Sequence, residues 1–280
     1  QILVVENDRV CHGASVVKRL QAEYPNSPMS YFLEPEIGLA SARNRALTLG
    51  LSSSADWIAF IDDDEEVLPG WIAAMRRAAA TIDAEVLTGP VLQTFEKRHF
   101  WMLPSKEKTR ERGSTLSTAA TNNTAIRAAW LRSRFPALSF DEDFNHTGGE
   151  DSDFFYRLAD MGGRIRWVDD AWVSEHVPAA RTAFRFQLVR TARVAENVFR
   201  IHRRRRGLTG ALRRYLPKAF GRLIGGAFSV SGGLALIVFA RSIGGRMIFS
   251  GCKALASSFG TVLGILGLRL KPYRPQRHDR

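Results

Sequence analysis

The chain has 280 residues, of which 45% are hydrophobic and 24% are charged, and its net charge is +12. This is the composition of a globular protein, and the length allows one large domain with an appendage. The two cysteines, Cys11 and Cys252, exclude a disulfide framework and a zinc site, and they fit a reducing compartment.

The charge is unevenly distributed along the chain. Residues 1–180 contain 19 Lys and Arg against 26 Asp and Glu, whereas residues 181–280 contain 21 basic and 2 acidic residues. An acidic body therefore carries a basic tail. This asymmetry predicts an anionic partner, either a nucleic acid or a membrane surface.

Strand and helix signals alternate over the first 90 residues. Apolar runs predict strands over residues 2–5, 29–33, 57–61 and 84–89, and helical spacing predicts helices over 14–24, 38–47 and 70–82. The alternation indicates an α/β fold with a mostly parallel sheet. No GxGxxG or GxxxxGK[ST] motif follows a strand, which disfavours a dinucleotide-dependent oxidoreductase and a P-loop NTPase. Because the chain starts directly at an apolar run, we expect it to be N-terminally incomplete.

The third predicted strand ends at an acidic turn, where Asp62, Asp63 and Asp64 are followed by two glutamates. In an open α/β sheet, ligands bind at this end of a strand. Carboxylates so close together repel one another, and Mg²⁺ or Mn²⁺ is their natural partner. A solvated acidic turn is the alternative.

Two other strand ends carry candidate ligand-binding residues. Gly38 permits a tight turn before a helix, and Arg43 lies in the first turns of that helix, where the macrodipole disfavours a cation. Arg43 therefore predicts a bound anion such as a diphosphate; an ordinary surface arginine is the alternative. Glu6 ends the first strand at a similar position, although ordinary turn chemistry explains it as well.

The segment after residue 90 is expected to be irregular over residues 95–113. Asn122 and Asn123 then lead into a short helix over residues 128–133. A strand is predicted over residues 165–168.

A second acidic cluster lies behind a pair of glycines. Glu150 and Asp151 stand near the start of a helix through residues 154–161, where the dipole favours a rigidly held carboxylate; a helix cap is the alternative reading. His176 is predicted just past a later strand, as a candidate nitrogen ligand for a carboxylate metal site.

Taken together, these segments resemble the inverting glycosyltransferases of family 2, which have the GT-A fold. The motifs occur in the family's order: VVENDR, GLASARNRAL, FIDDDE, TNNTAIR, GGEDSDFFYRL and EHVP. The resemblance implies a GT-A domain over residues 1–180, of the type found in bacterial exopolysaccharide synthesis. The family's first strand, with its proline-threonine-tyrosine segment, is missing.

The resemblance also implies roles for particular residues. The nucleotide-sugar-binding residues would be Glu6, Arg43, Asp62 and Asp63, the metal ligands Asp64 and His176, the acceptor-side residues Asn122 and Asn123, and the catalytic pair Asp151 and Glu150. UDP is favoured as the nucleotide by resemblance alone. A metal would stabilise the departing diphosphate, and Asp151 would deprotonate the acceptor hydroxyl. One base without a protein nucleophile implies inversion.

The tail predicts attachment to a membrane. Residues 181–214 are strongly basic, residues 223–240 carry no charge, and residues 247–268 carry one. Eighteen uncharged residues reach the length of a transmembrane candidate, although six glycines and serines weaken the hydropathy. A spanning or re-entrant hairpin, an interfacial helix and a soluble helical subdomain all remain open. The basic flanks favour the cytoplasmic face of a bacterial inner membrane, and a lipid-linked or polysaccharide acceptor is inferred.

Two readings from other classes compete with a transferase. One is a catalytically inactive glycan- or lipid-binding module of the same fold. The other is a nucleic-acid-binding protein that uses the arginine run; no nucleic-acid partner is expected, because the basic residues adjoin long apolar stretches and no aromatic recognition motif is present.

Overall fold

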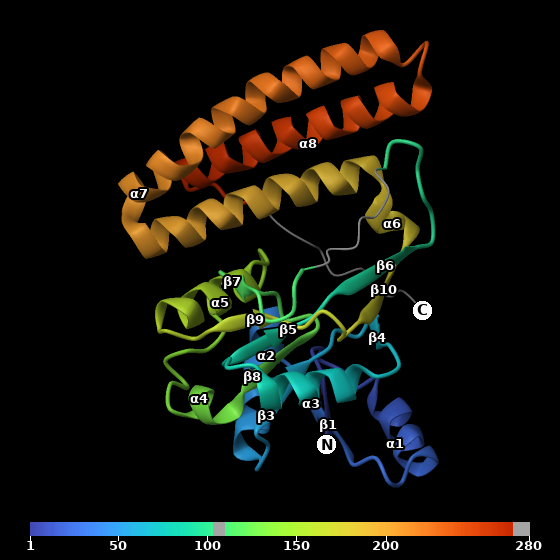
Figure 1. The fold of residues 1–280 in the computed structure, drawn as a ribbon, viewed down its shortest axis with the longest axis vertical. Helices are drawn as coiled ribbons and strands as arrows, with labels where there is room; N and C mark the ends of the chain where they lie inside the picture. Colours follow the sequence, from blue (N-terminus) through green and yellow to red (C-terminus); the bar gives the residue numbers. More distant parts are fainter. Residues whose placement is uncertain (103–109, 271–280) are drawn as a thin grey trace. The chain divides into compact units, whose positions relative to one another are not determined.

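The computed structural model describes residues 1–102 and 110–270. The chain divides into two compact units, shown with their elements in Figure 1. The first unit consists of residues 1–91 and 109–173, and the second of residues 92–108 and 174–280.

The first unit contains the alternating elements that the sequence predicts. Its helices are α1 (Ala14–Glu23), α2 (Leu39–Ser52), α3 (Trp71–Thr81), α4 (Ala128–Arg132), the short 3₁₀ helix η1 (Glu142–Phe144) and α5 (Glu150–Asp160). Its strands are β1 (Ile2–Glu6), β2 (Met29–Leu33), β3 (Trp57–Phe60), β4 (Glu65–Val67), β5 (Val86–Thr88), β7 (Thr115–Leu116), β8 (Thr124–Arg127) and β9 (Ile165–Trp167). The sequence did not predict β4, β7 or β8.

The main sheet of this unit is mixed rather than mostly parallel. Its strand order is β3-β8-β5-β9-β7. β5 and β9 are parallel, but β8 runs antiparallel to both β3 and β5, and β7 runs antiparallel to β9. β1 and β2 form a separate parallel pair. The sequence predicted a mostly parallel sheet mainly because it did not predict the antiparallel strand β8. This strand has only four residues, of which Thr124 and Ile126 are β-branched.

Helices cover both faces of this sheet. Val86 belongs to a buried cluster with residues of α2 and α5, whereas the next residue, Leu87, belongs to a cluster with residues of α3. Successive side chains of a strand point to opposite faces, so β5 lies between two helical layers. Phe140 and Phe154 stack at 4.2 Å in the first cluster and are both almost completely buried. This packing fixes the loop before α5 and the start of that helix.

The second unit is dominated by two long helices. Its elements are β6 (Val91–Phe95), β10 (Val173–Val177), α6 (Ala179–Thr182), α7 (Phe184–Leu236) and α8 (Arg241–Leu266). α7 is interrupted at Gly207, which has a φ of 72°, so it consists of a first half (residues 184–206) and a second half (residues 208–236). Figure 1 shows α8 lying between the two halves. β6 was not predicted and ends at Phe95, where the expected irregular segment begins. Residues 103–109 of that segment are outside the described residues.

Glycines allow α8 to pack closely on both halves of α7. A Cβ added at Gly251 would lie 2.7 Å from the carbonyl oxygen of Gly226 in the second half of α7. A Cβ at Gly260 would lie 1.9 Å from the carbonyl oxygen of Ala192 in the first half. Within the described part of the chain, α7 and α8 are the two helices long and apolar enough to cross a membrane by length and composition.

Candidate active site

The acidic turn follows β3, as the sequence predicts. Asp62 and Asp64 are half-buried, whereas Asp63 between them is exposed. The backbone N–H of Asp62 donates to Glu65 Oε2 at 3.2 Å, and the N–H of Glu65 donates to the Asp62 carbonyl at 3.1 Å. These two hydrogen bonds close the turn, in which Asp63 is more exposed than Asp62 and Asp64.

Arg43 joins the two acidic clusters of the first unit. Its guanidinium donates to Glu150 at the start of α5, and its Nη2 lies 3.6 Å from Asp62 Oδ1 after β3. The side chain of Glu150 is only 3% exposed. One arginine thus contacts residues that are far apart in sequence, and it brings the acidic turn and the first turn of α5 to the same place.

The electrostatics of these groups reflect their proximity. Burial is the main cause that raises the pKa of Asp62; Arg43 lowers this pKa, while Asp64, Asp63 and Asp151 raise it. Burial likewise raises the pKa of Glu150, against the lowering effect of Arg43. The charge of Asp151 raises the pKa of both Asp62 and Glu150.

The N-terminus of α2 is filled by an asparagine from a distant loop. The N–H of Ser41 donates to Asn145 Oδ1 at 3.1 Å, and Asn145 Nδ2 donates to the Ser41 hydroxyl at 2.9 Å. A Cβ at Gly38 would lie 2.1 Å from Asn145 Cγ, so only glycine leaves room for this contact. Asn7 holds the same turn by accepting a hydrogen bond of 2.7 Å from the N–H of Gly38. Apart from the position of Asn7 after β1, no sequence pattern predicts the roles of these two asparagines.

Glu6 is held by two hydrogen-bond donors at the end of β1. The N–H of Gly13 donates to Glu6 Oε2 at 2.9 Å, and the hydroxyl of Tyr31 donates to the same oxygen. Burial and the hydrogen bond to Glu6 raise the pKa of Tyr31 to about 12, so this hydroxyl keeps its proton at neutral pH. The predicted nucleotide-binding carboxylate is thus fixed in position.

The two adjacent asparagines before β8 have different environments. Asn122 donates to Glu65 Oε1 at 3.0 Å and therefore lies against the acidic turn. Asn123 is completely buried with a φ of 51°. Its amide donates to the carbonyls of Pro90 and Ala171 at 2.9 and 2.7 Å, and its Oδ1 accepts from Trp71 Nε1 at 2.7 Å. Asn123 consequently holds β5, α3 and the chain before β10 together.

The remaining predicted residues lie at the start of α5 and on β10. α5 begins at Glu150 rather than after it, so Asp151 is in the first turn, and its Oδ1 accepts a hydrogen bond of 2.6 Å from the N–H of Ser152. His176 is exposed and lies within β10 in the second unit, not just past a strand. Over residues 1–102 and 110–270, no group of three or more His, Cys, Asp or Glu side chains is arranged to hold a metal ion. The donor chemistry nevertheless suits a hard cation, because Asp62 and Asp64 offer only oxygen atoms.

A strand–helix alternation with an acidic turn at a strand end defines the first unit as a GT-A fold. This assignment agrees with the solved structure of residues 1–349 of TarS from S. aureus in complex with UDP-GlcNAc. The TM-score is 0.50 at 13% identity, and the alignment covers 100% of this chain and 85% of that chain.

The family follows from the sequence matches. Residues 1–138 match the family model described as Glycosyl transferase family 2. Residues 1–138 therefore form a glycosyltransferase family 2 domain, which supports a transferase. The chain is 29% identical over 280 residues to the succinoglycan biosynthesis protein ExoM of Rhizobium meliloti (strain 1021), covering 96% of this chain and 84% of that protein. It is 36% identical over 85 residues to the hyaluronan synthase of Pasteurella multocida, covering 29% of this chain and 8% of that protein.

Proposed function

We propose that the protein transfers a sugar from a nucleotide-sugar to a growing exopolysaccharide, with inversion at the anomeric carbon. The observation that carries the proposal is the contact of Arg43 with both Asp62 and Glu150, because it brings the two predicted acidic clusters together. The similarity to ExoM, which is named for succinoglycan biosynthesis, supports an exopolysaccharide product. UDP-sugars are the donors to test first, since the TarS structure with this fold contains UDP-GlcNAc.

Asp151 is the proposed catalytic base. It lies in the first turn of α5, next to the buried Glu150. Asp151 would take the proton from an acceptor hydroxyl while this oxygen attacks the sugar. Glu150 does not compete for this role, because its carboxylate is buried against Arg43.

Asp62, Asp64 and Arg43 form the proposed donor side. Asp64 would supply an oxygen ligand for Mg²⁺ or Mn²⁺, His176 stays the second predicted ligand, and Asp62 stays a predicted nucleotide-sugar contact. When bound, the cation would supply Lewis-acid stabilisation of the diphosphate. Arg43 adds a planar guanidinium, which Glu150 and Asp62 hold in one orientation. Glu6 and Asp63 stay predicted nucleotide-sugar contacts, and Asn122 a predicted acceptor contact.

The second unit is proposed to attach the protein to a membrane. The second half of α7 exposes Phe220, Ile224 and Phe228 on the face opposite its packed glycines Gly226 and Gly233, and Leu216, Leu223 and Leu234 on one flank of that face. Phe228 is 75% exposed. Exposed basic residues accompany this face, which suits an anionic lipid surface. A cytoplasmic location and a lipid-linked acceptor fit this attachment.

Attachment in the plane of the membrane fits the packing better than a spanning hairpin. α8 contacts the second half of α7 on one side and the first half on the other. The first half carries arginines at several positions, including Arg190 and Arg193. A charged side chain at the centre of a bilayer costs ~2.5–3.5 kcal/mol on translocon scales. We therefore infer that only the outer face of the second half of α7 enters the lipid interface.

A base substitution tests the transferase proposal. Asp151→Asn should lower the rate of sugar transfer by roughly 10²–10⁴-fold, the usual contribution of a general base. Transfer from UDP-sugars would be measured with Mn²⁺ and with membranes as the source of acceptor. Asp160→Asn is the matched control, because it makes the same change at an exposed position at the other end of α5. Equal activities of the two variants would contradict the assignment, and absence of transfer from every donor would favour an inactive binding module.

A further inference from the structure

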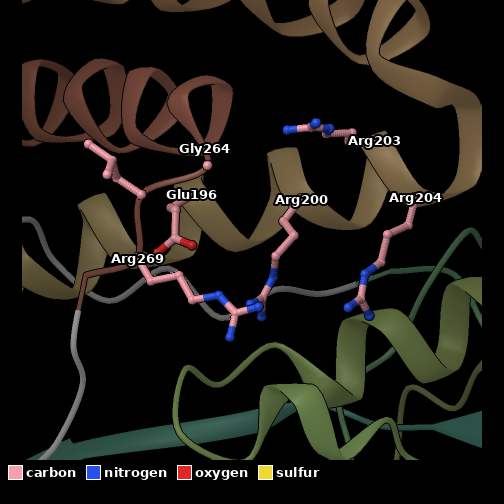
Figure 2. Close-up of a pocket in the computed structure, with 8 residues that line it drawn as sticks. Glu196, Arg200, Arg203, Arg204, Gly264 and Arg269 are labelled. Atoms are coloured by element: carbon pink, nitrogen blue, oxygen red, sulfur yellow. The ribbon is translucent and has the colours of Figure 1, made fainter.

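Glu196 and Asn44 each hold a remote backbone segment with a polar side chain. In the second unit, Glu196 is 1% exposed and lines a cavity of about 360 Å³ together with Arg269, as Figure 2 shows. It accepts a hydrogen bond of 3.4 Å from the N–H of Leu270 and thereby fixes the chain after α8. In the first unit, Asn44 holds the loop before α5. Asn44 adjoins the proposed active site, because the residue before it on α2 is Arg43.

The side-chain amide of Asn44 pairs with the backbone of Phe140, which lies 96 residues later in the chain. Its Nδ2 donates to the Phe140 carbonyl at 2.9 Å, and its Oδ1 accepts from the Phe140 N–H at 2.7 Å. The amide thus makes the two hydrogen bonds that a neighbouring strand would otherwise make with this residue. Two bonds to one residue fix both the distance and the orientation of the loop relative to α2.

The ring of Phe140 packs between the elements that carry the proposed active site. It is 1% exposed and lies edge-on to Phe60, the last residue of β3, with 6.1 Å between the ring centroids. It stacks at 4.2 Å on Phe154 of α5, and the Cζ of Arg43 lies 6.0 Å from its centroid. A shift of Phe140 would therefore be felt at the end of β3, at Arg43 and at the start of α5, where Asp151 lies.

The same loop is held to α2 at a second point. Asn145 bonds to both the N–H and the hydroxyl of Ser41, at 3.1 and 2.9 Å. Ser41 and Asn44 are three residues apart and therefore lie on one face of the helix. The loop is consequently fixed to this face of α2 before the chain enters α5.

We propose that Asn44 is a positioning residue for sugar transfer, which places Asp151 relative to Arg43 and the acidic turn through its hydrogen bonds to Phe140. This role rests on the proposed function, in which inversion requires the base and the donor diphosphate to lie on opposite sides of one sugar. Misplacement of a reacting group by ~1 Å can lower the rate by ~10²-fold. Asn44 thus affects the rate through the alignment of α2 with α5.

Asn44→Ala tests this role, because it removes both hydrogen bonds to Phe140. The kcat for transfer from the best UDP-sugar, measured with Mn²⁺ and with membranes as the source of acceptor, should fall by roughly 10–100-fold. The KM for the donor should stay close to that of the wild type, because the donor-side residues themselves are unchanged. Hydrogen–deuterium exchange should become faster at residues 139–145, because the Phe140 N–H loses its acceptor.

Two further variants separate positioning from a general loss of stability. Met75→Ala truncates a residue of α3 that is 7% exposed and belongs to the buried cluster on the other face of the sheet. It should lower the urea midpoint of unfolding but keep the wild-type kcat and the wild-type exchange at residues 139–145. Asn44→Asp keeps the size of the side chain and the acceptor for the Phe140 N–H but loses the donor. It should also lower kcat, and it replaces Asn44→Ala if the alanine variant does not fold.

Several results would overturn the assignment. A wild-type kcat in folded Asn44→Ala would show that the contact does not align the site. An equal fall of kcat in Met75→Ala would reduce the effect to lost stability, and a raised KM with unchanged kcat would assign Asn44 to donor binding. Absence of transfer by the wild type from every donor would remove the proposed function. Faster exchange in Asn44→Ala would then mark the contact as purely structural.

Discussion

Arg43 occupies a helix position that disfavours a cation, and the sequence therefore predicts a neighbouring anion. In the structure, the anions next to Arg43 are the protein's own Glu150 and Asp62. The need for a negative charge was visible from local helix physics. The residues that pair with Arg43 could not be predicted, because Glu150 is distant in sequence. The packing of α2 and α5 in the core brings Glu150 close to Arg43.

Asn122 and Asn123 show how adjacent identical residues acquire different roles. The sequence assigned both to the acceptor side. The structure buries the Asn123 side chain completely with three hydrogen bonds, and leaves Asn122 against the acidic turn. Successive residues near the start of a strand point in opposite directions, and β8 was not predicted, so this difference was not accessible from the sequence.

Substitution of these two residues separates stability from activity. Asn123→Ala should destabilise the protein by roughly 3 kcal/mol, because three buried partners lose their hydrogen bonds. Asn122→Ala should change the free energy of unfolding by less than about 1 kcal/mol and should lower sugar transfer. Urea unfolding followed by tryptophan fluorescence measures the first effect, and the transfer assay the second. A more stable Asn123→Ala variant than Asn122→Ala would refute this division.

At the scale of elements, α8 depends on glycines at its two contact faces. Gly251 meets the second half of α7, and Gly260 meets the first half. Close backbone approach through small residues is common between helices in membranes, where lipid competes with apolar side chains for helix surfaces. The sequence predicted the apolar character of this region, and the glycines were read only as a weakening of its hydropathy.

A pair of glycine substitutions tests this packing. Gly260→Ala should destabilise the second unit by ~1–3 kcal/mol, because the new methyl group would overlap the Ala192 carbonyl. Gly225→Ala is the control: its Cβ would meet nothing within 4 Å, so the higher helix propensity of alanine should leave stability unchanged or raise it by up to ~1 kcal/mol. Thermal unfolding of both variants would be followed by circular dichroism at 222 nm. Identical melting of Gly260→Ala and the wild type would show that the helices separate at this point.

At the scale of the whole molecule, the charge asymmetry and the apolar helices belong to one unit. The exposed apolar residues on the second half of α7 accompany the exposed Arg213, Arg214, Lys218 and Arg222. This combination predicts binding that depends on both lipid charge and apolar contact.

Vesicle flotation measures this binding. The full chain should float with vesicles of phosphatidylcholine and phosphatidylglycerol more than with phosphatidylcholine alone. Phe220→Asn/Phe228→Asn should weaken this binding roughly tenfold or more through loss of buried apolar area. Val189→Asn/Val194→Asn alters exposed apolar residues on the first half of α7 and should have little effect. If neither double variant changes flotation, the second half of α7 is not the membrane-binding surface. If the chain self-associates without lipid, this surface binds a second copy of the chain.

The sequence predicted the elements whose signals are local. The order of elements up to β5 (apart from β4), the acidic turn and the acidic start of α5 follow from apolar runs, turn residues and helix signals, which are local. The antiparallel insertion of β8, the positions of Asn7 and Asn145, and the interruption of α7 at Gly207 depend on contacts between distant segments or on one backbone dihedral. Periodicity carries no information about such pairings.

Because α8 lies between the two halves of α7, the second unit cannot complete its packing until the ribosome has synthesised α8. Until α8 has left the ribosome, α7 has no partner for either of its glycine-contacted surfaces, and its apolar side chains stay open on two sides. Nascent chains that stall before Arg241 should therefore be captured by chaperones or proteases, whereas completion of the last helix closes the unit in a single late step.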